Sequence, residues 1–144
     1  ALLASLQAKG EGLIKTEQMF AEIIQTGSGP YGLASLVQLG RAYENMGESL
    51  AESDVPFYLT EAQREIYELQ IEDKVYPQIQ KATEAYGAAL GKAFELTLYN
   101  EHTALATRRL GELDPEQYPG LEEQLVEPRA TTSSNRSYTF ETEL

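Results

Sequence analysis

Apolar residues recur at the spacing of an α-helix along nearly all of residues 1–113, and this periodicity constrains the fold more than any other feature of the chain. Five residues of the first stretch fall on one stripe at multiples of about 3.6 positions, and they are Leu2, Leu6, Leu13, Phe20 and Ile24. No strand pattern is repeated in this part of the sequence. We therefore expect an all-α fold made of antiparallel helical hairpins.

Glycine and proline separate the first two expected helices. The stretch from Gly27 to Pro30 supplies unusual backbone angles and then a proline that suits the first turn of a helix. A second helix is expected from Tyr31 to about Ser53, antiparallel to the first. Its buried stripe recurs at i, i+3, i+4 and i+7 and consists of Leu33, Leu36, Val37, Gly40, Tyr43, Met46, Gly47 and Leu50.

A third helix is expected to begin at Thr60, because Thr60 and Gln63 have the spacing of a capping box. One apolar stripe continues along it through Tyr67, Ile71, Val75, Ile79, Ala82, Tyr86, Ala89, Ala93 and Thr97. Pro77 interrupts this stretch and leaves two interpretations open. In one, the kept phase indicates a single kinked helix, although an interior proline costs about 3 kcal/mol. In the other, Val75 and Tyr76 form a tight turn and Pro77 begins a separate helix.

Asn100 is expected to cap a last long helix from Glu101 to about Leu113, which Asp114 and Pro115 end. Four residues of this helix are expected to face inward, namely Thr103, Ala106, Leu110 and Leu113. The sequence thus predicts a helical domain over residues 1–114. Prolines punctuate residues 115–130, which leaves room only for short helical turns such as 121–125. Residues 131–144 form a polar, extended tail.

Charge and composition exclude several function classes. Eleven basic residues stand against twenty-three acidic ones, and a net charge of −12 repels the phosphates of nucleic acid and of anionic lipid. No apolar run is long enough to span a bilayer. The chain has no cysteine and a single histidine, His102, so thiolate chemistry and histidine-rich metal sites are excluded. We expect neither an enzyme nor a cofactor.

The segment from Leu36 to Gly47 has the spacing Leu-Gly-x-x-Tyr-x-x-x-Gly, carried by Leu39, Gly40, Tyr43 and Gly47. In the first helix of a tetratricopeptide repeat this glycine admits a close neighbouring helix. The segment therefore resembles a tetratricopeptide first helix.

A second segment, from Ala82 to Ala89 with Tyr86 between them, resembles the second helix of such a repeat, where small residues flank an aromatic side chain. Glu52 and Pro56 replace the alanine and the aromatic residue that follow the first helix in the family pattern, and no 34-residue period extends over the chain. The resemblance implies a degenerate α-solenoid.

Longer segments are similar to tetratricopeptide proteins of gliding bacteria, over roughly residues 20–120. The segments that carry this similarity are Gly29–Met46, Glu72–Pro77, Leu98–Thr103 and Ala106–Leu113. Such proteins belong to the cell envelope, and some link periplasm to outer membrane in the gliding-motility machinery. The resemblance implies a periplasmic or outer-membrane-associated scaffold and carries no catalytic residue.

If the second helix is of this type, the positions beside its Leu-Gly-Tyr face line a groove. They are Ala34, Val37, Gln38, Arg41, Glu44 and Asn45. Gln38, Arg41 and Asn45 are candidates to hold a peptide backbone or an anionic side chain by hydrogen bonds. The alternative is an ordinary polar face of an amphipathic helix.

Two adjacent arginines, Arg108 and Arg109, are candidates to contact an acidic partner or the acidic tail. The alternative is a pair between Arg108 and Glu112, one helical turn away. His102 beside Glu101 is expected to be a surface residue at a helix start, because adjacent helical residues point in different directions.

Four glutamates three or four positions apart could gather a hard cation such as calcium, but such a row is more typical of a solvated helix face. They are Glu61, Glu65, Glu68 and Glu72. No calcium-binding loop motif accompanies them, so we expect no metal site.

Three functions remain open from the sequence. The first is a non-catalytic scaffold that binds other proteins in a cell-envelope assembly. The second is a periplasmic receptor for peptides. The third, from another class, is an enzyme or a carrier of small molecules, which no residue constellation in the chain supports.

The tail generates a prediction of its own. Tyr138, Phe140 and Leu144 alternate with polar residues at the period of a strand, and no predicted sheet exists to receive them. We expect these residues to anchor the tail in the helical groove of this chain or of a second copy. Deleting residues 131–144 should then lower the melting temperature, or convert an oligomer into a monomer as measured by light scattering. An unchanged melting temperature and an unchanged mass would refute this docking.

Overall fold

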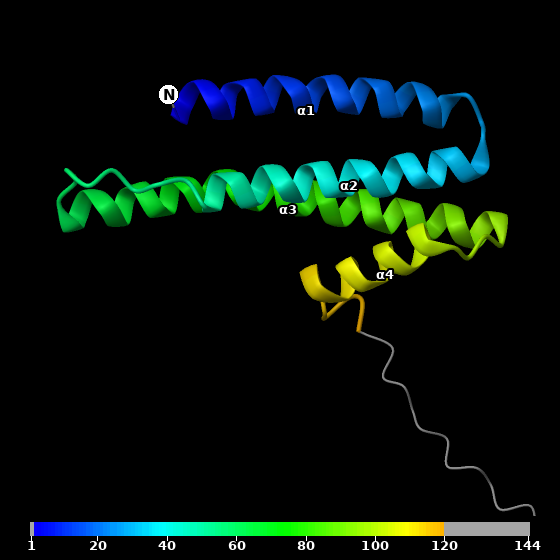
Figure 1. Ribbon diagram of the computed structural model, residues 1–144. Coiled ribbons are helices and arrows are strands. Elements are labelled where there is room, and N and C mark those ends of the chain that lie inside the picture. Colours follow the sequence, from blue (N-terminus) through cyan, green and yellow to red (C-terminus); the bar gives the residue numbers. More distant parts are fainter. Residues whose placement is uncertain (1, 120–144) are drawn as a thin grey trace, which may run out of the picture.

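The computed structural model describes residues 2–119, and these form four α-helices joined by short connections (Figure 1). The helices are α1 (Leu2–Gln25), α2 (Gly29–Ala51), α3 (Glu61–Leu96) and α4 (Glu101–Leu113). Each helix runs antiparallel to the one before it (Figure 1). The expected all-α fold is therefore confirmed for this part of the chain. The expected turn at 121–125 and the tail residues Tyr138, Phe140 and Leu144 lie outside the described residues.

The core lies mainly between α2 and α3, which pack along much of their length. It is built from the two stripes that the sequence predicts, together with the inner face of α4. Its buried members are Leu33, Val37, Tyr43, Ala82, Tyr86, Ala89, Ala93, Ala106 and Leu110. Alanines occupy three of the four α3 positions in this core, and their small side chains let the backbones of α2 and α3 approach closely. Tyr86, Leu33, Val37 and Leu110 are fully buried, and burying such a side chain contributes about 1.5–3 kcal/mol.

The outer helices pack on this pair from different sides. α1 packs against α2, and its apolar stripe, including Leu13 and Phe20, is only half-buried. α4 runs at an oblique angle to the α2–α3 pair and packs on both of these helices (Figure 1). After α4 the chain turns, and Tyr118 packs back against the core beside Gly87. Each helix therefore contacts its neighbours in sequence, and α4 also contacts α2.

Pro77 lies inside α3, which continues through it without a break. The interpretation that places a tight turn at Val75 and Tyr76 is therefore wrong. Proline removes one backbone donor and leaves the Asp73 carbonyl without its helical partner, but both residues are exposed, so water can hydrate that carbonyl. Packing of the half-buried Ile79 and of the buried alanines beyond it holds the helix in phase.

Side-chain caps fix where α3 and α4 begin, as the sequence predicts. The Thr60 hydroxyl accepts from the Gln63 amide, while the Gln63 side chain accepts from the Thr60 amide at 3.0 Å, which completes the capping box. The Asn100 side chain accepts from the amides of His102 and Thr103. By contrast, α2 begins two residues earlier than expected.

The glycine motif of α2 makes room for an aromatic ring of α3. A Cβ atom built on Gly40 would lie 2.7 Å from Cε1 of Tyr86, far inside van der Waals contact. We expected a neighbouring helix backbone at this point, and that expectation is corrected: the group that approaches Gly40 is the fully buried ring of Tyr86.

This contact yields a prediction about stability. Gly40→Leu should lower the free energy of unfolding by more than ~2 kcal/mol, because the added side chain must displace a buried ring. Gly91, on the exposed side of α3, has no atom within 4 Å of an added Cβ. Gly91→Leu is therefore a matched control and should raise stability by up to ~1 kcal/mol through helix propensity. Urea unfolding measures both values, and equal effects of the two substitutions would contradict the packing described here.

Candidate functional site

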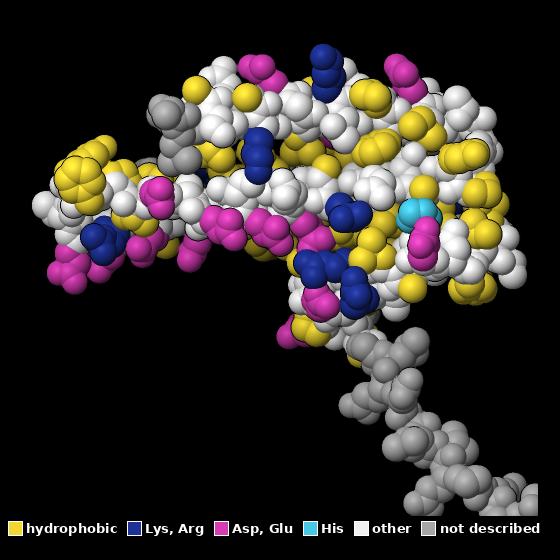
Figure 2. Space-filling view, in the orientation of Figure 1, with side chains coloured by type: hydrophobic (Ala, Val, Ile, Leu, Met, Phe, Trp, Pro, Cys, Tyr) yellow, Lys and Arg dark blue, Asp and Glu magenta, His cyan; other side chains and the backbone are white. Residues whose placement is uncertain are grey.

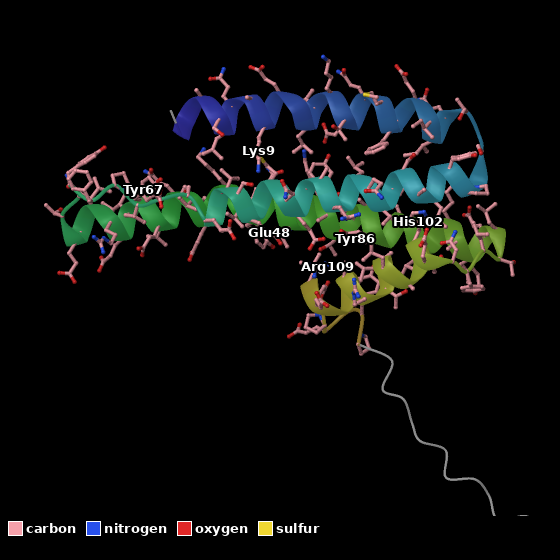
Figure 3. The ribbon with its side chains drawn as sticks, viewed as in Figure 1. Lys9, Glu48, Tyr67, Tyr86, His102 and Arg109 are labelled. Carbon is pink, nitrogen blue, oxygen red and sulfur yellow. The ribbon has the colours of Figure 1, made fainter. Side chains whose placement is uncertain are left out.

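A buried carboxylate lies where α2, α3 and α4 meet. Glu44 is only 7% exposed, and it receives hydrogen bonds from the other two helices. The Tyr86 hydroxyl donates to Glu44 Oε2. Arg109 donates from Nε to Oε1 and Oε2 at 3.0 and 3.2 Å, and its Nη2 also donates to Oε1. Figure 3 shows Tyr86 and Arg109 lying close together at this junction. We call these three residues the buried triad.

The hydrogen bonds of the triad shift the pKa values of its two donors. Burial, and then the hydrogen bond to the Glu44 carboxylate, raise the pKa of Tyr86 far above its usual range. The hydrogen bond to Glu44 likewise raises the pKa of Arg109. The Tyr86 phenol and the Arg109 guanidinium therefore both hold their protons while they donate to Glu44. The arrangement joins three helices at one point.

The sequence did not indicate the triad. Val37, expected to line a groove, is fully buried, and Glu44 is held by the triad with only a small exposed fraction. Arg109, expected to contact a partner, pairs inside the protein. It also donates from Nη1 to Glu112, so the expected pair between Arg108 and Glu112 is wrong. One signal was available: Glu44 follows Val37 and Gly40 at i+7 and i+4, which places its carboxylate on the buried stripe.

An open groove lies above the triad, between α1, α2 and α4. Its volume is about 830 Å³. The groove is lined by Thr16, Phe20, Gln38, Arg41, Ala42, Glu44, Asn45, Glu48, Tyr86, Leu105, Arg108 and Arg109. It brings the predicted α2 residues together with Arg108 from a helix that is distant in sequence. We call this the central groove.

A smaller depression adjoins the central groove at the start of α4. Its volume is about 650 Å³, and it shares Gln38, Arg41, Leu105 and Arg108 with the central groove. Figure 2 shows Lys and Arg side chains gathered where α2 and α4 meet, with Asp and Glu side chains among them and the histidine to their right. We call this the side depression.

Asn45 differs from the other predicted groove residues because its side chain is already engaged. Lys9 of α1 donates from Nζ to Asn45 Oδ1 at 3.3 Å and also to the Ser49 hydroxyl. Figure 3 shows Lys9 pointing from α1 toward α2. Asn45 therefore helps to hold α1 in place at the far end of the central groove, while Gln38 and Arg41 lie toward α4.

His102 lines the side depression and is half-buried at the start of α4. Its Nε2 lies 4.0 Å from Glu101 Oε1, although we expected these adjacent residues to point apart. The Glu101 side chain is 89% exposed, so this pair is weak. No Ser, Thr or Tyr hydroxyl is hydrogen-bonded to His102 in the described part of the chain.

A second groove, between α3 and α4, has mostly apolar walls. It has a volume of about 930 Å³, and Leu90, Phe94, Tyr99 and Ala104 contribute to it. Phe94 and Tyr99 are largely exposed.

The acidic row on α3 is solvated. Glu61, Glu65, Glu68 and Glu72 are all exposed. Across residues 2–119 no three histidine, aspartate or glutamate side chains are grouped so that they could hold a metal ion.

Comparisons with known proteins add no relative: no family model matches the chain, and neither a curated protein nor a solved structure shows significant similarity to it. None of the four described helices is both long and apolar enough to cross a membrane.

The two adjacent arginines generate a prediction because their environments differ. Arg109→Ala leaves the buried Glu44 carboxylate without its cation and should destabilise the protein. Breaking a buried pair costs about 3–5 kcal/mol, and we expect about 2 kcal/mol here because water reaches the partly exposed Arg109. Arg108→Ala removes an exposed side chain and should change stability by less than ~0.5 kcal/mol. Thermal and urea unfolding of both variants check this, and equal losses would show that the triad does not hold α4.

Proposed function

We propose that this chain is a non-catalytic protein–protein interaction module that receives its partner in the central groove and the side depression. The observation that carries the proposal is that the arginines at this surface differ in whether a carboxylate of the fold already binds them. Arg109 and Glu44 also line the central groove but are hydrogen-bonded to each other, whereas Arg41 and Arg108 are exposed there and form no ion pair among residues 2–119. Exposed guanidinium and amide groups at an open groove suit the binding of another protein chain, and this supports the proposal.

The proposal includes a tetratricopeptide-like, α-solenoid class for the fold. The two segments that resemble a repeat meet at one point, because Gly40 of the first admits the ring of Tyr86 of the second. The order of packing also supports it, since each helix contacts the next one and α2 contacts α4 across the stack. This is the neighbour-to-neighbour arrangement of repeat proteins.

The setting we propose is a cell-envelope assembly of the gliding-motility kind, with a periplasmic or outer-membrane-associated location. This part of the proposal depends on the resemblance of the sequence segments and on no contact in the structure. The role within such an assembly is that of a scaffold, which binds large partners stably.

The alternative within the same class is a periplasmic peptide receptor. The size of the central groove favours this alternative, because about 830 Å³ holds a few residues of an extended peptide. A receptor and a scaffold differ in what remains bound after purification.

Co-purification from native cells tests the proposal. The full chain and an Arg41→Glu, Arg108→Glu variant are purified in parallel, with Arg64→Glu on the exposed face of α3 as a control. A scaffold returns a large partner in stoichiometric amount, and a receptor returns short peptides. In both cases the groove variant loses the ligand and the control keeps it. A bound small molecule, or partners that both variants retain equally, would refute the proposal.

A further inference from the structure

Two arginines from different helices line the same surface without an ion pair. Arg41 of α2 and Arg108 of α4 contribute to both the central groove and the side depression. No carboxylate lies within ion-pair distance of either one among residues 2–119, whereas Arg109 takes two carboxylates. Two guanidinium groups on one surface repel each other unless an anion lies between them.

This local charge runs against the charge of the whole chain. Acidic residues outnumber basic ones by twenty-three to eleven. In the side depression, however, Arg41 and Arg108 face a single carboxylate, that of Glu101, whose side chain is 89% exposed and therefore well hydrated. Glu44 and Glu48 also line the central groove, but Glu44 is bound within the buried triad, and Glu48 is exposed. A ligand anion is thus favoured at the two arginines and disfavoured over most of the remaining surface.

The surroundings of the two arginines favour carboxylates carried on an extended peptide. The half-buried side chains of Phe20 and Leu105 give the groove apolar walls, against which aliphatic stems can pack. The Gln38 amide can both donate to and accept from a peptide backbone. In an extended chain alternate residues share one face about 7 Å apart, and each guanidinium can hold one carboxylate through two parallel hydrogen bonds.

We infer that Arg41 and Arg108 bind the carboxylates of an acidic, extended segment of a partner protein. This inference rests on the proposed function and adds the chemistry of the partner. The segment belongs to another protein molecule and not to this chain. Occupation of the site by the tail of this chain is the competing arrangement that the experiment below distinguishes.

Fluorescence anisotropy with defined peptides tests the inference. The probe is a labelled ten-residue peptide of alternating glutamate and threonine, and the control probe has glutamine in place of each glutamate. The acidic probe should bind the full chain at least ~10-fold more tightly than the neutral one. Its affinity should fall as salt is raised.

Matched variants assign the binding to the two arginines. Arg41→Ala and Arg108→Ala should each weaken binding of the acidic probe at least ~10-fold, while Arg64→Ala, at the distant end of α3, should leave it unchanged. Arg41→Lys keeps the charge but loses the planar fork, so it should restore only part of the affinity. Circular dichroism confirms that each variant is folded. Equal binding of both probes, or an equal loss with Arg64→Ala, would overturn the inference.

A truncated chain separates this inference from its competitor and from the proposed function. If the acidic probe binds only after residues 131–144 are deleted, the tail is the occupant and binding in trans is refuted. If only the neutral probe binds, and Leu105→Glu abolishes that binding, the acidic chemistry is wrong but the groove remains a binding surface. If neither probe binds while the Arg41→Glu, Arg108→Glu variant loses the partner that co-purifies with the unchanged chain, the inference fails and the proposed function stands.

Discussion

The hydrogen-bonded carboxylate of Glu44 is the interaction on which the rest of this structure depends. Burying a carboxylate costs several kcal/mol unless charged and polar partners replace its water. Here Tyr86 and Arg109 replace it, and they come from two other helices. The position of Tyr86 depends in turn on Gly40, because any side chain there would occupy the space of the ring. One glycine, one carboxylate and two donors thus set how α2, α3 and α4 sit together.

The same interaction determines the candidate binding surface. Once Arg109 is held against Glu44, the geometry of a helix turns the adjacent Arg108 by about 100° and places it at the central groove. Arg41 reaches that groove from α2, three residues before Glu44. The structural and the binding roles are therefore carried by residues that lie close together in sequence on the same two helices. A substitution that disturbs the triad is expected to change the groove as well, so stability has to be measured alongside binding.

Local signals predicted much of this fold from the sequence. The caps at Thr60 and Asn100 act within four residues, and the apolar stripes follow from helical periodicity alone, so neither requires knowledge of the tertiary structure. The outcome at Pro77 was not predictable in this way. The local cost of an interior proline had to be weighed against packing that the sequence does not display, and packing prevailed.

The candidate site was predicted only in part, for a related reason. Gln38 and Arg41 line the central groove, and Arg108, which follows Arg41 by more than sixty positions in the sequence, reaches it from α4. The rotation of α4 about its axis decides whether Arg108 or Arg109 turns inward. An error of one residue in the expected inward face exchanges the roles of the two arginines. The partners of Glu44 were not predictable, because Tyr86 and Arg109 come from helices far along the chain, although its position in the apolar stripe indicated burial.

The central claim is that Glu44 and Arg109 act together to join α4 to α2. A double-mutant cycle on the free energy of unfolding tests it most directly, with Glu44→Gln, Arg109→Ala and the combined variant measured in urea. The double variant should lose less stability than the two single variants lose together, with a coupling energy above about 1 kcal/mol. Losses that add within about 0.5 kcal/mol would contradict it, because two residues that do not interact behave independently.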